Sequence, residues 1–104
     1  MSTQAVFSID VRADRVIVSG RLDMVSVPEM SQAVLRVAFL SARQVELDLS
    51  NVTSFDSSGL SALLQLQRSV SPLVVAVSPA VQRVLDVTDT ALIFKTHSPL
   101  LPAA

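Results

Sequence analysis

Short stretches of period-two hydrophobicity alternate with helical stretches along this chain, and this alternation limits the folds available to it. Strand patterns occupy residues 7–11, 16–18, 45–49 and 73–77. In the first and third of these, apolar and polar side chains alternate, which is typical of a strand with one buried face. The last is apolar throughout, which predicts a strand that is covered on both faces and lies inside the sheet.

A turn at Ala13 and Asp14 joins the first two strands, so they are expected to form a hairpin whose second arm ends at Gly20. The first helix is predicted at about residues 27–40. Ser26 and Glu29 have the spacing of a capping box before it, and apolar residues recur within it at helical spacing. Half of the residues are hydrophobic and only 4% are aromatic, so the core is expected to consist mainly of aliphatic side chains.

A second helix is predicted to begin in the turn Asp56-Ser57-Ser58-Gly59, after a short polar connection over residues 50–56. Its buried side is expected to contain Leu60, Leu63, Leu64 and Leu66. Ser78 followed by Pro79 has the pattern of an N-cap with proline in the first helical position, which predicts a third helix with Val81, Val84 and Leu85 facing inward. Residues 92–94 are a candidate for a last short strand.

The resulting order, β-β-α-β-α-β-α-β, predicts an α/β fold with a mixed sheet of four to five strands. With 104 residues the chain has the size of one domain. We expect a single domain over residues 1–104, with an ordered core at about residues 4–95 and a loose, proline-containing tail over residues 96–104.

The residue types needed for catalysis or metal binding are scarce. The chain has no cysteine, two distant glycines and a single histidine, His97, which lies in the tail. These counts exclude a Gly-rich phosphate loop and argue against a catalytic triad or a zinc site, so we expect no enzyme activity, no metal and no cofactor. A net charge of −1 with scattered arginines argues against nucleic-acid binding. No apolar run approaches 18 residues, and a cytoplasmic protein without membrane insertion is expected.

The turn Asp56-Ser57-Ser58-Gly59 allows two compatible interpretations. In the structural one, Asp56 or Ser57 caps the helix and Gly59 permits close packing. In the functional one, a serine hydroxyl at the surface accepts a phosphate, which the helix N-terminus accommodates while the surface charge changes by about −1.5 to −2. Residue chemistry alone leaves the acceptor open between the two serines.

Three blocks of the sequence resemble the anti-sigma factor antagonist family, whose domain is called STAS. These blocks are residues 20–23, 45–60 and 74–85, in the order found in that family, and the middle block is the most specific. The resemblance implies a STAS-like fold and a phosphoacceptor at Ser57. It also places Asp23 on the partner-facing surface, and we expect Asp56, Ser58 and Gly59 to take part in partner binding as well.

The resemblance further implies the partners. The unphosphorylated protein is expected to bind an anti-sigma factor with serine kinase activity and so release a sigma factor, until phosphorylation of Ser57 breaks the complex. A phosphatase would reverse the modification, and the protein itself would be a monomer or weak dimer. Asp23 is equally well explained as a residue that caps its own loop.

Two alternatives remain open: an accessory or scaffold subunit of a stress-signalling complex or membrane transporter, and a small-molecule sensor. Three features depart from the family pattern. The connection over residues 67–72 and the segment at residues 88–91 lack the glycines common there, and the segment after Lys95 is short for the family's usual final helix.

Overall fold

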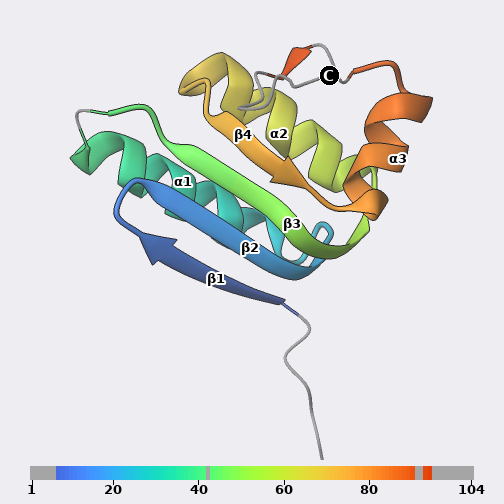
Figure 1. The fold of residues 1–104 in the computed structure, drawn as a ribbon, viewed down its shortest axis with the longest axis horizontal. Coiled ribbons are helices and arrows are strands. Elements are labelled where there is room, and N and C mark those ends of the chain that lie inside the picture. The colour runs from blue at the N-terminus through green and yellow to red at the C-terminus, as the bar shows by residue number, and fades with distance from the viewer. Residues whose placement is uncertain (1–6, 42, 91–92, 95–104) are drawn as a thin grey trace, which may run out of the picture.

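The computed structural model describes residues 7–41, 43–90 and 93–94. Within these residues the elements are β1 (Phe7–Arg12), β2 (Arg15–Leu22), α1 (Val27–Leu40), β3 (Glu46–Phe55), α2 (Ser57–Ser69), β4 (Leu73–Val77) and α3 (Pro79–Val87). The strands form one sheet with the order β1-β2-β3-β4 (Figure 1). β1 and β2 form an antiparallel hairpin, whereas β2, β3 and β4 are parallel. The predicted α/β fold with a mixed sheet is confirmed, with four strands in the described residues.

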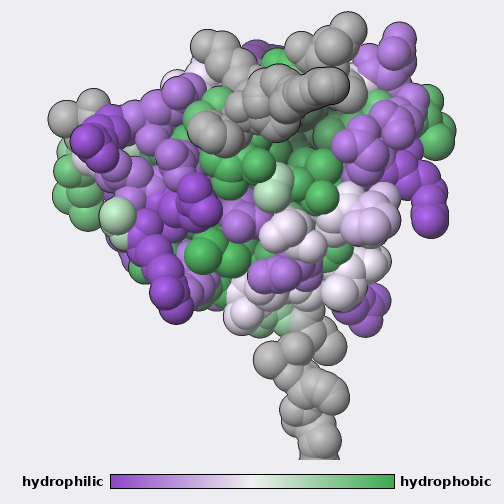
Figure 2. Space-filling model, in the orientation of Figure 1, coloured by the Kyte–Doolittle hydropathy of each residue, from purple (hydrophilic) through white to green (hydrophobic). Residues whose placement is uncertain are grey.

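α1 and α2 pack against each other and cover one face of the sheet, while α3 packs on β3 and β4 (Figure 1). Buried aliphatic side chains of the strands meet those of the two helices: Val16, Val18, Leu47 and Leu49 from β2 and β3, Met30, Val34 and Val37 from α1, and Leu63 and Leu66 from α2. The predicted aliphatic core is therefore present. The face of the molecule seen in Figure 2 is a mosaic of hydrophilic and hydrophobic residues.

The helices begin where the sequence predicts them. α1 has the predicted bounds, and Ser78 caps α3 because its Oγ accepts a hydrogen bond of 3.3 Å from the Val81 amide. In α2, Leu63 and Leu66 are buried as expected, whereas Leu60 and Leu64 are only half-buried.

Residues other than glycine occupy left-handed backbone positions at three turns: Ala13 (φ 54°), Ser71 (φ 45°) and Asp89 (φ 59°). Ala13 lies in the two-residue hairpin turn between β1 and β2. Ser71 and Asp89 lie in the two segments where the sequence lacks the glycines expected from the family pattern. The chain therefore keeps the turn geometry that glycine favours, at an energetic cost that a Cβ imposes in this region.

The prediction that residues 50–56 form a polar connection is wrong, because β3 continues to Phe55. Its second half pairs with β2 through Ser19–Asn51, Gly20–Val52 and Leu22–Phe55, after register shifts that break the regular alternation. Gly20, with φ 96°, lies between two of these shifts, and β2 continues past it to Leu22. Backbone pairing with β2 therefore holds a segment whose side chains are largely polar and exposed.

The prediction that residues 73–77 lie in the sheet interior is also wrong. Within the described residues β4 is an edge strand, and among its side chains Val74 alone is buried. Of the predicted last strand, Leu92 lies outside the described residues, and Ile93 and Phe94 are not in a strand. The Phe94 side chain is nevertheless buried and joins the core. The predicted loose tail and the limits of the ordered core also fall largely outside the described residues.

Candidate functional site

The candidate site lies where β2 and β3 end side by side. These parallel strands pair Leu22 with Phe55, their last residues, so Asp23 and Asp56 leave the sheet from the same edge. An ideal Cβ on Gly59 would lie 3.2 Å from the Leu22 carbonyl oxygen, which shows that the first turn of α2 rests on the end of β2. The structure thus brings together two segments that are more than 30 residues apart, at the edge where parallel sheets bind ligands.

Asp56 is the N-cap of α2. Its Oδ1 accepts hydrogen bonds from the amides of Ser58 (3.0 Å) and Gly59 (3.2 Å). Ser57 is therefore free of the capping role and begins the helix as an exposed residue, while Ser58 is half-buried. The structural interpretation of this turn is confirmed for Asp56, and the same geometry leaves the Ser57 side chain accessible at a helix N-terminus, where a phosphate is favourably placed.

Gly59 is buried against an aromatic ring. A Cβ at this position would lie 2.7 Å from Cε1 and 2.8 Å from Cδ1 of Phe55. The ring occupies the space that any other residue would need, so glycine is required for α2 to begin this close to the sheet. Gly59 thus has a clear packing role, and its part in partner binding stays a prediction.

Asp23 organises the loop before α1. Its Oδ1 accepts hydrogen bonds from the amides of Val25 (3.0 Å) and Ser26 (3.3 Å). The predicted capping box at Ser26 is wrong, because the Ser26 side chain makes no cap hydrogen bond to α1. Its hydroxyl instead donates to the Arg21 carbonyl oxygen (2.7 Å) and accepts from the Asp23 amide (3.0 Å). The interpretation of Asp23 as a loop-capping residue is confirmed, and its contact with a partner stays a prediction.

The pKa of Asp23 is lowered from its ordinary value. Desolvation by burial acts in the opposite direction and raises the pKa, but the backbone hydrogen bonds from Ser26 and Val25 stabilise the carboxylate. The positive charge of Arg21 and the Ser26 hydroxyl add to this stabilisation. Asp23 therefore presents a fixed negative charge at neutral pH beside the turn that holds Ser57.

Two large apolar side chains at this edge were not predicted from the sequence. Met24 and Val25 are 70% and 84% exposed, in the loop held by Asp23. The available signal was that they follow a strand and precede a helix without belonging to the apolar pattern of either. Exposed apolar side chains next to an ordered polar turn are typical of protein-binding surfaces.

No group of three or more potential metal-ligating side chains occurs in the part of the chain that the structure describes. Among the same residues, none of the helices has the length and apolar character required to cross a bilayer.

Comparison with known proteins gives a consistent result. The family model described as Mlab, STAS domain, matches residues 5–93. An anti-sigma factor antagonist from Mycobacterium paratuberculosis has a similar structure, with a TM-score of 0.69, 29% sequence identity, and coverage of 91% of this chain and 86% of that chain. No curated protein sequence matches this chain.

The anti-sigma factor antagonist SpoIIAA, in its unphosphorylated form, has the same fold, with a TM-score of 0.63, 19% identity and coverage of 89% of both chains. The family match extends over nearly all of the described residues and includes both segments of the candidate site, Asp23–Ser26 and Asp56–Gly59. This chain belongs to the STAS domain family.

Proposed function

We propose that this protein is an anti-sigma factor antagonist, which binds an anti-sigma factor with serine kinase activity and is inactivated when that partner phosphorylates Ser57. The observation that carries the proposal is the arrangement around Ser57: it is the exposed first residue of α2, Asp56 caps that helix, and the exposed Met24 and Val25 follow the neighbouring strand at the same edge of the sheet. Similarity to the mycobacterial antagonist supports the assignment. The protein contributes a binding surface and the acceptor hydroxyl, and the kinase supplies the catalytic groups.

The proposed partner surface combines Met24 and Val25 with the polar turn at residues 56–58. Met24 and Val25 would supply apolar contact area, and the carboxylate of Asp23 would hold their loop in place. Ser58, half-buried beside the acceptor, would help to position the turn in the kinase active site. The surface needs little rearrangement, because hydrogen bonds within each loop already fix its conformation.

Phosphorylation of Ser57 would act through charge. The phosphate adds about −1.5 to −2 charges next to the Asp56 carboxylate. A partner carboxylate about 6 Å away would then be repelled by roughly 1 to 5 kcal/mol, for effective dielectric constants between ~80 and ~20. This corresponds to a loss of affinity between about five-fold and several thousand-fold. The fold would be retained, because Asp56 keeps its cap bonds.

Incubation with the cognate kinase and labelled ATP tests the proposal. We expect one phosphate per chain, none in Ser57→Ala, and unchanged labelling in the matched control Ser58→Ala. Because Asp56 and not Ser57 caps α2, Ser57→Ala keeps the fold intact, and circular dichroism verifies this. Labelling that persists in Ser57→Ala would refute the assignment of the acceptor.

Pull-down of partners from the native cell tests the switch itself. Wild-type protein should retain the kinase, whereas Ser57→Asp should lose it, because the carboxylate supplies part of the negative charge of a phosphate. Equal retention by both baits would contradict the electrostatic mechanism. The phosphatase is expected to remove the phosphate from Ser57 and so restore the hydroxyl.

A second candidate is an accessory or scaffold subunit, since the matching family model carries the name Mlab and not that of an antagonist. In that function the same edge would bind its partner without a phosphorylation cycle. Met24→Ser would then weaken partner binding, while Ser57→Asp would leave it unchanged. The pair of variants therefore distinguishes the two candidates.

A further inference from the structure

The outer face of α1 carries a stripe of exposed residues opposite its buried face. Met30, Val34 and Val37 point into the core, whereas Glu29, Gln32, Arg36, Phe39 and Leu40 are exposed along the opposite side. Val25, in the turn just before the helix, is exposed as well, and we include it as the beginning of the stripe. We call this set, from Val25 to Leu40, the α1 stripe.

Both ends of the α1 stripe are apolar. Val25 is 84% exposed at its beginning, and Phe39 and Leu40 are 89% and 76% exposed at its end. Side chains of this size are costly to leave in water, at about 25 cal/mol per Å² of apolar surface. The two apolar ends together point to a partner that covers the whole length of the helix.

Charged residues lie between the apolar ends, with opposite signs. Glu29 and Arg36 are seven residues apart, or about 10.5 Å along the helix axis, which is too far for an ion pair within one helix. Within residues 7–41, 43–90 and 93–94, neither takes part in a salt bridge. A partner that neutralises both charges needs a basic group opposite Glu29 and an acidic group opposite Arg36.

The α1 stripe is complementary to itself when two copies run antiparallel. Glu29 and Arg36 lie at equal distances from the midpoint between Gln32 and Ala33, and the same holds for Val25 and Leu40. A two-fold axis at that midpoint therefore places Glu29 opposite Arg36 twice, and Val25 opposite Leu40 twice. An anionic membrane would leave Glu29 facing negative charge, so the pattern favours a second copy of this chain.

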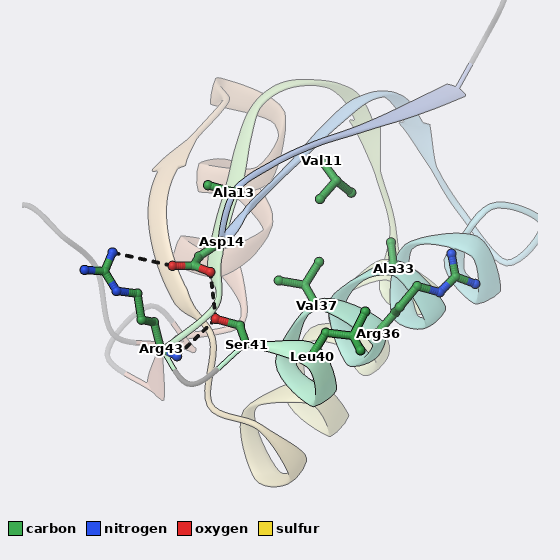
Figure 3. A pocket seen from close by; sticks show the side chains of 9 residues that line it. All are labelled: Val11, Ala13, Asp14, Ala33, Arg36, Val37, Leu40, Ser41 and Arg43. Carbon is green, nitrogen blue, oxygen red and sulfur yellow. Dashed lines mark hydrogen bonds and ion pairs between the residues drawn. The ribbon is translucent and has the colours of Figure 1, made fainter.

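Hollows on both sides of the helix provide space for the second copy. One, of about 710 Å³, lies between α1 and the end of β1, and the other, of about 670 Å³, lies between α1 and Val70. Figure 3 shows Arg36 and Leu40 on successive turns of α1, with Val11 across the first hollow. A ridge of side chains between two grooves is the shape by which helices pack on one another.

We propose that this protein self-associates through the α1 stripe into an antiparallel, two-fold symmetric dimer. Along the helix from Val27 to Leu40 the stripe is about 20 Å long and about 10 Å wide, so it covers only about 200 Å² per copy, which is below the range for stable interfaces and suits a transient contact. The dimer is accordingly weak, with a dissociation constant of roughly 100 µM. The proposal does not depend on the function of Ser57.

Charge reversal in the full chain tests the proposal by sedimentation equilibrium. Wild type should show a monomer–dimer equilibrium, and Arg36→Glu and Glu29→Arg should each raise its dissociation constant at least ten-fold, because two like-charged pairs replace two ion pairs. Mixing the two single variants should restore dimers, since all pairs in the mixed dimer are again of opposite sign. The double variant with both changes should dimerise like wild type.

Phe39→Ser should weaken the dimer, whereas Val87→Ser, which changes a 79% exposed residue on α3, is the matched control and should leave it unchanged. All changed side chains are exposed, and circular dichroism verifies that each variant folds. Wild type that stays monomeric up to about 500 µM would overturn the proposal. A mixture of the two charge variants that sediments as monomers would overturn it as well.

Discussion

Gly59→Ala tests whether the close approach of α2 to the sheet is as tight as the structure indicates. The added Cβ would lie 2.7 Å from Cε1 of Phe55, where ordinary contacts begin at 3.4 Å. The ring would have to move by about 0.7 Å, and it is 9% exposed, so it is confined by its neighbours. The same Cβ would lie 3.2 Å from the Leu22 carbonyl oxygen, so the backbone of β2 also limits how far the helix can shift.

The expected magnitude follows from two opposing effects. Overpacking a confined site costs about 1–3 kcal/mol, whereas alanine stabilises a helix interior by up to about 1 kcal/mol relative to glycine. The gain is smaller in the first turn, where Gly59 lies. We therefore expect Gly59→Ala to reduce the free energy of unfolding by about 1–2 kcal/mol and to lower Tm by roughly 4–8 °C.

Urea denaturation and thermal unfolding, both followed by circular dichroism, measure this change. Ser61→Ala, at an exposed position of the same helix, is the matched control and should stabilise slightly. Phe55→Leu combined with Gly59→Ala should cost less than the two single changes together, because the smaller side chain leaves room for the methyl group. A Gly59→Ala variant as stable as wild type would refute the steric argument.

Three further outcomes are expected. Ala13→Gly should raise the free energy of unfolding by about 0.5–1 kcal/mol because Ala13 has φ 54°. Asp89→Gly should raise it less because aspartate tolerates this backbone region better than alanine. Urea denaturation of both variants that gives the reverse order would contradict this. Asp23 has a lowered pKa, so its contribution to stability is present above about pH 4 and is lost as the pH falls through the lowered pKa. When the free energy of unfolding is measured against pH, Asp23→Asn should therefore show a smaller decrease on the acid side than wild type. Finally, if Val25 serves both surfaces, dimerisation should compete with kinase binding. The apparent affinity of wild type for the kinase should then fall once the concentration of wild type exceeds the dimer dissociation constant, and titrations with Arg36→Glu should show no such dependence.

Local patterns predicted most of the fold because local physics determines it. The hairpin, α1 and the N-cap of α3 each follow from periodicity or capping residues within a few positions of one another. β3 was predicted too short, since the polar residues of its second half are held by backbone pairing with β2. The hydropathy of the side chains therefore does not indicate that this segment is a strand, because the pairing involves backbone groups. β4 was placed inside the sheet because its apolar run is typical of a central strand, but in the part of the chain that the structure describes the sheet order makes it an edge strand.

The candidate site was predictable in part for the same reason. Asp56 as a cap follows from the sequence next to it, and the structure confirms this role. The Ser26 capping box failed because the Asp23 carboxylate accepts the hydrogen bond of the Ser26 amide, and the Ser26 hydroxyl donates to the Arg21 carbonyl oxygen and does not cap α1. The position of Met24 at the same edge as Ser57 depends on the end of β2 lying beside the end of β3, which is a tertiary relation that no local pattern contains.

The two proposed surfaces meet at Val25, and this overlap has a physical consequence. The loop held by Asp23 presents Val25 both to the edge that contains Ser57 and to the beginning of the α1 stripe. One side chain cannot be buried by two partners at once, so kinase binding and self-association would exclude each other. A phosphate on Ser57 adds charge at the start of α2 and not on the α1 stripe, so it would weaken the first complex more than the second. Phosphorylation would then shift the protein toward its dimer, which requires no change of fold.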